Sequence, residues 1–349
     1  MPGKPEIEKM VAEKDVAGLM EAIKNSTHCG RELIETLAAM GEPAVEVLLA
    51  ILTKCDGGVR HTVLEVLGKV KSGAAVAALI CALDNENSDV RWRAAEALGR
   101  SRDVRAVGAL VNTLGDKDPG VRCAAAEALG RIRDERAVEA LAAALEDEDP
   151  GVRACAAEAL GKTGGERSVQ ALGRALGDID SEVRIKAVEA LGRIKGPAVV
   201  DALLVALRDE NSSVRWRALE AFGKIRDRRS LEALTAALND RDAGIRRKAV
   251  EVLGEIRDPS TVGSLVSALK DENQGVRWLA AEVLGEMRDR RAVEALMTAA
   301  ADEDAGVRRS AVEALGKIGD PRAIAVLIKA LGDEDAQVRR RAAWALNEI

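Results

Sequence analysis

Aromatic residues are scarce in this 349-residue chain, which has no tyrosine, one phenylalanine (Phe222) and four tryptophans. Long apolar runs are missing as well. No stretch of about 18 consecutive apolar residues occurs, so no membrane span is expected. The N-terminal sequence MPGKPEIEKMVAEKD lacks the apolar segment of a secretory signal. We therefore expect a cytoplasmic protein without a membrane partner.

Cysteine and histidine are also few. The five cysteines include no Cys-x-x-Cys pair, and their odd number argues against a disulfide framework or a structural zinc knuckle and fits a reducing compartment. His28, Cys29, Cys55 and His61 are suitable metal ligands by type, but their spacing is irregular. No metal and no cofactor are expected.

Neither sign of charge dominates. The net charge is −6 and the isoelectric point lies near 5.4, so the whole chain does not resemble a general binder of polyanions. Alanine, leucine, valine, glutamate and arginine are abundant instead. Such a composition, with charges at helical spacing, predicts an all-α protein.

One phrase organises the sequence: DPGVRCAAAEALG, at Asp118 to Gly130, returns in similar form every 31 residues. Its Val-Arg pair, once Ile-Arg, begins at residues 59, 90, 121, 152, 183, 214, 245, 276, 307 and 338. A fixed period of this length indicates a stacked array of repeats.

Each repeat is predicted to contain two helices. The first, for example Ala137 to Leu145, places Val138, Leu141 and Leu145 on one apolar stripe. The second begins after an Asp or Asn whose side chain can accept hydrogen bonds from exposed backbone N–H groups. These expected caps are Asp56, Asn87, Asp118, Asp149, Asp180, Asn211, Asp242, Asn273, Asp304 and Asp335.

Two further repeated features are expected to be structural. The arginine of each Val-Arg pair and an acidic or amide residue five positions before the valine predict a ladder of bidentate pairs between successive repeats. A glycine follows in nearly every second helix, for example Gly130. Glycine costs a helix about 1 kcal/mol relative to alanine, and close approach of a neighbouring helix is the simplest compensation.

The motif D-x-x-VR-x-x-AA-E-ALG-x-I resembles the HEAT-like repeats of the phycobilisome-lyase type. The resemblance covers nearly the whole chain and implies an all-α, right-handed α-solenoid of about eleven helical hairpins, whose second helices line a concave surface. Residues 1–41 are then a degenerate N-terminal capping repeat, and residues 42–349 form a single continuous array.

Some proteins with such repeats are enzymes, namely phycobilin lyases and a non-haem iron hydroxylase acting on a modified lysine. The hydroxylase needs His-Glu motifs, but neither His28 nor His61 is followed by glutamate. No local lyase signature and no nucleophile–base pair occur. We therefore assign no catalytic residue and expect no enzymatic activity, and chromophore handling is implied by the resemblance alone.

The copies differ most at the second and third positions after the valine, which are expected to face solvent. Three tryptophans share one of these positions, and tryptophan and arginine dominate binding hot spots. A tryptophan that lies on a neighbouring arginine stem without a partner is the alternative. The predicted binding residues are Trp92, Arg93, Trp216, Arg217, Arg247, Lys248, Trp278, Leu279 and Arg309. Cys123 and Cys155 occupy these positions in adjacent repeats, as space-fillers or, less simply, as a reactive thiol pair.

Three partner classes are compatible with this pattern. A protein or peptide is favoured, because glutamates recur on the same face as the arginines and give it mixed charge. Nucleic acid is the alternative, through base stacking on tryptophan and phosphate contacts to arginine, and strong salt dependence would reveal it. Self-association through the ends of the solenoid is a third possibility.

Overall fold

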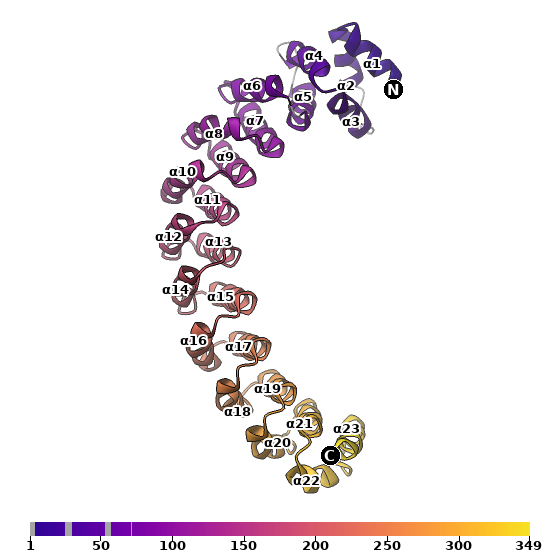
Figure 1. Cartoon of the computed structure of the whole chain (residues 1–349), viewed down its shortest axis with the longest axis vertical. Coiled ribbons are helices and arrows are strands. Elements are labelled where there is room, and N and C mark those ends of the chain that lie inside the picture. The colour runs from indigo at the N-terminus through magenta and orange to yellow at the C-terminus, as the bar shows by residue number, and fades with distance from the viewer. Residues whose placement is uncertain (1–3, 25–29, 53–56, 71) are drawn as a thin grey trace. The chain divides into compact units, whose positions relative to one another are not determined.

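The computed structural model describes residues 4–24, 30–52, 57–70 and 72–349, and within these ranges it contains helices and no strands (Figure 1). The chain divides into two compact units, Met1–Ile194 (unit 1) and Lys195–Ile349 (unit 2). In each unit, taken by itself, helical hairpins stack so that first helices form one row and second helices another. Each unit is thus an α-solenoid, as predicted.

Unit 1 opens with an additional helix, α1 (Lys4–Ala12), ahead of its hairpins. The hairpins are α2 (Val16–Lys24) with α3 (Gly30–Met40), α4 (Glu42–Leu52) with α5 (Gly57–Lys69), α6 (Gly73–Ala82) with α7 (Ser88–Ser101), α8 (Val107–Thr113) with α9 (Pro119–Ile132), α10 (Val138–Ala143) with α11 (Pro150–Thr163), and α12 (Glu166–Ala175) with α13 (Ser181–Leu191).

Unit 2 repeats the same arrangement. Its hairpins are α14 (Pro197–Ala206) with α15 (Ser212–Ile225), α16 (Leu231–Ala236) with α17 (Ala243–Ile256), α18 (Val262–Ala268) with α19 (Gln274–Met287), α20 (Val293–Ala299) with α21 (Ala305–Ile318), and α22 (Ile324–Ala330) with α23 (Ala336–Glu348). The boundary at residue 41 and the continuity of one array over 42–349 remain predictions.

The predicted N-caps are confirmed wherever the structure describes them. Each of the nine side chains from Asn87 to Asp335 accepts a hydrogen bond from a backbone N–H at the start of its second helix. Asp56 lies outside the described residues. Aspartates between repeats cap the short 3₁₀ turns that lead into most first helices. Gly165 and Gly196 replace two of these aspartates at positive φ, without a side-chain cap.

The recurring glycines lie where successive second helices touch. A Cβ atom placed on Gly130 would lie 2.7 Å from the Cα of Ala159 in the next second helix, which is closer than real Cβ atoms approach backbone. Gly99, Gly161, Gly285 and Gly316 meet the alanine of their neighbouring helix in the same way. Close helix approach, as predicted, therefore compensates for the low helix propensity of glycine.

This arrangement predicts opposite effects for the same substitution at two helical glycines. Gly130→Ala should lower the free energy of unfolding by about 1–3 kcal/mol, because the added methyl group overpacks a backbone contact. Gly108→Ala in α8 should raise it by about 0.5–1 kcal/mol, since a Cβ there has no atom within 4 Å. Urea denaturation of both variants measures the two changes in the free energy of unfolding. Destabilisation by Gly108→Ala would contradict the view that close helix approach decides the effect.

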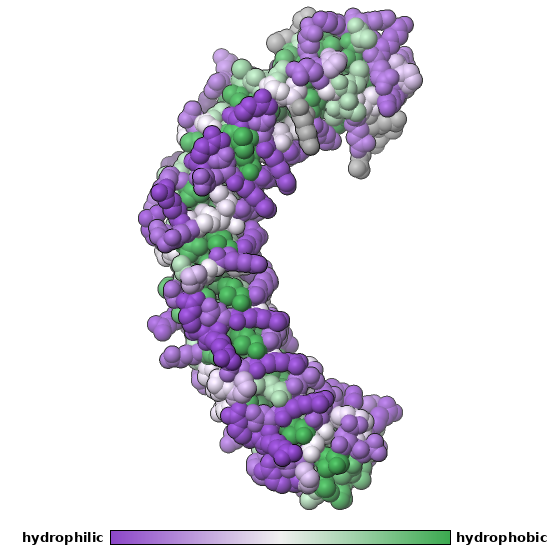
Figure 2. All heavy atoms as spheres, in the orientation of Figure 1, coloured by the Kyte–Doolittle hydropathy of each residue, from purple (hydrophilic) through white to green (hydrophobic). Residues whose placement is uncertain are grey.

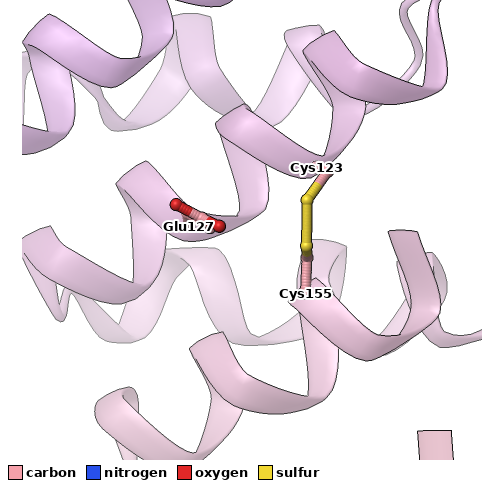
Figure 3. A group of neighbouring side chains, drawn as sticks. All are labelled: Cys123, Glu127 and Cys155. Carbon is pink, nitrogen blue, oxygen red and sulfur yellow. A yellow bond between two sulfur atoms is a disulfide. The ribbon is translucent and has the colours of Figure 1, made fainter. Parts of the chain in front are cut away.

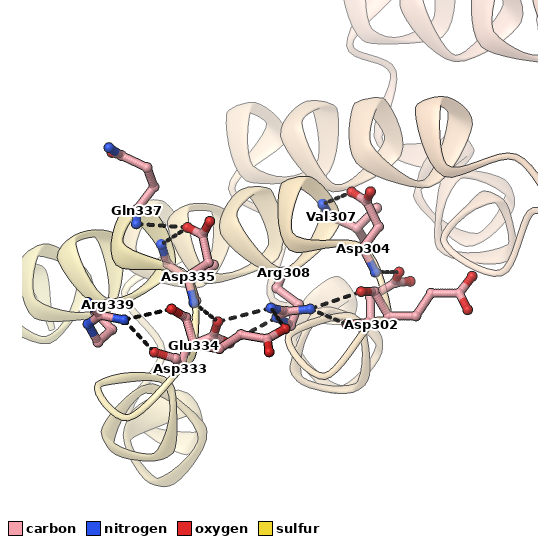
Figure 4. Close-up of polar contacts among 11 residues, drawn as sticks. Asp302, Asp304, Val307, Arg308, Asp333, Glu334, Asp335, Gln337 and Arg339 are labelled. Carbon is pink, nitrogen blue, oxygen red and sulfur yellow. Dashed lines mark hydrogen bonds and ion pairs between the residues drawn. The ribbon is translucent and has the colours of Figure 1, made fainter.

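The predicted arginine ladder is confirmed. Arg122 donates from Nε and Nη2 to the two carboxylate oxygens of Asp147 at 2.8 and 2.7 Å, and from Nη1 to the backbone carbonyl of Asp116 at 2.9 Å. Figure 4 shows the last such pair, Arg308 with Asp333. Further bidentate pairs include Arg91–Asp116, Arg153–Asp178, Arg215–Asp240, Arg246–Asp271 and Arg277–Asp302.

The ladder lowers the pKa of Asp116 and so makes stability depend on pH. Hydrogen bonds from Arg91 hold the pKa of Asp116 below its usual value, against the opposing effect of burial. A carboxyl with a depressed folded-state pKa stabilises the fold above its unfolded pKa, near 3.9, and loses this contribution as the pH falls through the folded value. We expect the urea concentration at the midpoint of unfolding to decrease as the pH is lowered from about 5 to about 2. Asp116→Asn should make this midpoint depend less steeply on pH. An unchanged dependence would show that Asp116 does not contribute to it.

Candidate functional site

Within each unit, the variable residues of the repeats lie on one surface. We call it the second-helix face: the side chains two, three and six positions after the valine or isoleucine of each pair. The valine, most of the arginines and most of the alanines of the motif are buried between helices, so most of the remaining positions are left for solvent; Ala124 and Ser310 are buried exceptions. Trp92 is 37% exposed, and Trp216 and Trp278 are half-buried.

A fixed register links neighbouring second helices on this face. The side chain two positions after one valine meets the side chain three positions after the next valine, 32 residues later. His61 Nδ1 lies 2.6 Å from Arg93 Nη1, and Lys248 Nζ lies 5.6 Å from the ring centre of Trp216. Cys123 and Cys155 form the third such pair. In these three pairs, the variable side chains that touch are 32 residues apart, one residue more than the repeat length.

Two tryptophan rings of unit 2 cover the start of the next second helix. A Cβ on Gly244 would lie 3.9 Å from Cζ3 of Trp216, and a Cβ on Gly306 would lie 3.9 Å from Cδ1 of Trp278. At least one atom of each ring thus lies near the backbone of the next second helix, and each half-buried ring keeps an accessible part. Rings that are held in this way need little further ordering when a partner binds.

The predicted cations differ in what they contact. Lys248 bonds Glu251 at 2.6 Å, and Arg217 bonds Glu220 at 2.9 Å. Arg93 contacts Asp89 at 3.0 Å and lies over the ring of Trp92, 5.5 Å from its centre. These three are engaged within the protein. Across the part of the chain that the structure describes, Arg247 and Arg309 have no ion-pair partner, and Arg247 is exposed.

The glutamates of the face keep it from being uniformly positive. Hydrogen bonds from Lys224 and Arg217 lower the pKa of Glu220, so its carboxylate is ionised at neutral pH. Glu251 and Glu313 likewise face Lys248 and Lys317 in ion pairs. The face is therefore mixed in charge, which suits a protein surface better than a phosphate backbone.

An open crevice of about 500 Å³ lies between α15 and α17. Its origin is Val252, which stands where most repeats have alanine. The neighbours of a Cβ on Gly223 are side-chain atoms of Glu255 and Val252 at 3.0 and 3.5 Å, rather than the backbone met at Gly130. This crevice is not among the sequence predictions, although valine at the alanine position is a visible signal of it. The lining residues are Glu220, Gly223, Lys224, Arg226, Lys248, Val252 and Glu255.

A family model matches most of this chain. The model for HEAT repeats matches the chain in eight overlapping segments, at residues 45–118, 76–154, 108–181, 139–213, 174–254, 200–276, 232–313 and 262–347. The chain belongs to the HEAT repeat family. No curated protein sequence matches it.

Solved structures of importin-like HEAT repeat proteins are similar in fold. Kap121p, bound to the extreme C-terminus of the protein phosphatase Cdc14p, has a TM-score of 0.62 at 14% identity, over 90% of this chain and 42% of that one. Kap95p, in a structure on its binding to RanGDP, has a TM-score of 0.58 at 15% identity, over 99% and 55%. Human deoxyhypusine hydroxylase is 26% identical with a TM-score of 0.32, over 87% and 95%.

The expectation that the cysteines form no disulfide is wrong for one pair. Cys123 and Cys155 are bonded to each other, with their Cα atoms 5.5 Å apart. The odd cysteine count was a poor guide, because the 32-residue register brings these two positions together. His28, Cys29 and Cys55 lie outside the described residues.

None of the helices in the described ranges has the length and apolar character that a bilayer crossing needs.

An apolar stripe lies at the C-terminal end of unit 2. Ile324 and Ile328 on α22 are 39% and 57% exposed, and Leu331, which caps the end of α22, is 42% exposed. Figure 2 shows green atoms gathered at this end of the unit. Self-association through an end of the solenoid remains a prediction.

Proposed function

We propose that this protein is a non-enzymatic scaffold that binds a protein or peptide on the second-helix face of unit 2. The observation that carries the proposal is the presence on this face of two half-buried, partly accessible tryptophan rings, Trp216 and Trp278, and of two arginines, Arg247 and Arg309, that form no ion pair in the described structure. Leu279 adds a half-buried apolar side chain beside them.

The chemistry of this surface indicates the partner's character. Aromatic anchors favour apolar side chains in the partner, and arginine forks favour carboxylates. An acidic peptide segment with apolar residues satisfies both. The binding of Kap121p to the C-terminus of another protein is a precedent in a HEAT-like fold for capture of a chain end. Trp92 and Arg93, on unit 1, form a separate contact point in this proposal.

Finer assignments also belong to the proposal. Because of the motif in the sequence, we assign the repeats to the phycobilisome-lyase type of HEAT-like repeat. We also propose that the protein is cytoplasmic. Nucleic acid is the second candidate partner, because Trp216 and Trp278 alternate along the face with Arg247 and Arg309. The ionised glutamates of the face oppose it.

The test uses the full chain and a displayed library of random peptides. Peptides selected by the native chain should be acidic with apolar residues and should lose at least about 30-fold in affinity for Trp216→Ala/Trp278→Ala, which is about 2 kcal/mol. A matched control is Ile179→Ala/Val205→Ala, which removes two exposed apolar side chains at 94% and 62% exposure elsewhere. Equal affinity of the tryptophan variant and the native chain would overturn the proposal. Preferential binding of single-stranded DNA, with a steep salt dependence, would favour nucleic acid.

A further inference from the structure

Three potential metal ligands gather on the second-helix face of unit 1. Cys123 and Glu127 come from α9 and Cys155 from α11, and one ligand atom from each lies within 4.8 Å of the other two. All three side chains are half-buried. Figure 3 shows the sulfur atoms of the two cysteines joined and Glu127 one helical turn along from Cys123.

The repeat geometry explains why these groups meet. Cys123 stands two positions after its valine and Cys155 three positions after the next valine, which is the register that also joins His61 to Arg93 and Trp216 to Lys248. Small residues, Ala124 and Ala154, lie beside the cysteines where other repeats have larger groups. Both cysteine side chains are half-buried, so part of each remains accessible.

Reduction turns this cluster into a ligand set for a soft cation. A dithiol reductant supplies two electrons and two protons, which converts the Cys123–Cys155 bond into two thiols and the reductant into its own disulfide. Two thiolates and one carboxylate are then available, which are donors that zinc-type ions prefer. With metal–sulfur bonds of about 2.3 Å, two thiolates on a tetrahedral ion lie about 3.8 Å apart. Side-chain rotation alone reaches this separation from Cα atoms 5.5 Å apart.

We propose that the reduced protein binds one thiophilic divalent cation, of the zinc or cadmium type, through Cys123, Cys155 and Glu127. Binding releases the two thiol protons, and a fourth coordination position is left for water or an added ligand. Arg131 donates to Glu127 at 3.0 Å and acts as a positioning residue for the carboxylate. The disulfide form, whose sulfurs are bonded to each other, does not bind the cation. This site is independent of the peptide surface proposed for unit 2.

Cadmium titration of the full chain tests the proposal. The chain reduced under anaerobic conditions should take up one tightly bound cadmium ion at this site, with thiolate-to-cadmium absorption in the ultraviolet. Cys123→Ser/Cys155→Ser should lose that ion and its absorption while it retains Cys29, Cys55 and Cys81, so the difference between the two proteins isolates the pair. The oxidised native chain, identical in sequence, should lack the same signal.

Glutamate variants test the third ligand. Glu127→Gln should bind cadmium at least about tenfold more weakly, because loss even of outer-shell partners costs a metal site that much. Glu96→Gln is the matched control, since Glu96 occupies the equivalent position one repeat earlier and pairs with Arg100 at 3.5 Å as Glu127 pairs with Arg131. Equal uptake by the reduced native chain and the double cysteine variant would overturn the site. Equal affinity of Glu127→Gln and native chain would overturn the role of the carboxylate.

Discussion

Arg277→Met is expected to lower the free energy of unfolding of unit 2 by about 3–5 kcal/mol, the usual cost of removing one partner of a buried ion pair. Arg277 is 8% exposed and donates to both carboxylate oxygens of Asp302, at 2.8 and 2.9 Å. It also donates to the backbone carbonyls of Asp271 and Glu272. Methionine fills much of the same volume but leaves the Asp302 carboxylate without its cation and the two carbonyls without a donor.

The last repeat provides a control at the equivalent position. Arg339 follows its valine as Arg277 does and donates to the carbonyls of Asp333 and Glu334, but it is exposed, and among the described residues no carboxylate pairs with it (Figure 4). Arg339→Met should therefore cost about 1 kcal/mol or less. Urea unfolding followed by tryptophan fluorescence measures both variants. Equal losses would show that the ion pair does not stabilise the stack.

Cys123→Ser/Cys155→Ser is expected to lower the free energy of unfolding of the repeats around α9 and α11 by about 3–4 kcal/mol in oxidising buffer. The bond joins residues 32 apart in sequence and so restricts the unfolded chain over that loop. Hydrogen exchange of α9 and α11, compared with urea unfolding of the whole chain, measures the loss in the helices concerned. A dithiol reductant should bring the native chain to the level of the variant.

Cys81→Ser supplies the matching control for the disulfide. Cys81 is a free, exposed cysteine in α6, and its replacement should leave hydrogen exchange of α9 and α11 unchanged. If the native chain exchanges these amides equally fast with and without reductant, the bond contributes nothing to their protection.

The sequence predicted that the variable positions face solvent, but it did not reveal which side chains they contact. Comparison among the repeats placed Trp92, Trp216 and Trp278 at a variable position, and the structure leaves all three at least partly accessible. It treated Lys248 as available to a partner, whereas the structure engages it with Glu251 and the Trp216 ring. Whether these residues bind a partner is the subject of the peptide experiment.

The sequence by itself determined the features that act within one repeat or recur identically between repeats. Caps such as Asp118 bond backbone groups two or three residues away, and the Arg122–Asp147 type of pair repeats at constant spacing, so periodicity alone exposes both. Tertiary structure decided which variable side chains meet, because that depends on the separation and rotation of two packed helices. The Cys123–Cys155 bond forms because the register of neighbouring helices pairs positions 32 residues apart. The crevice forms because Val252, at a position that is usually alanine, keeps two helix backbones from close contact.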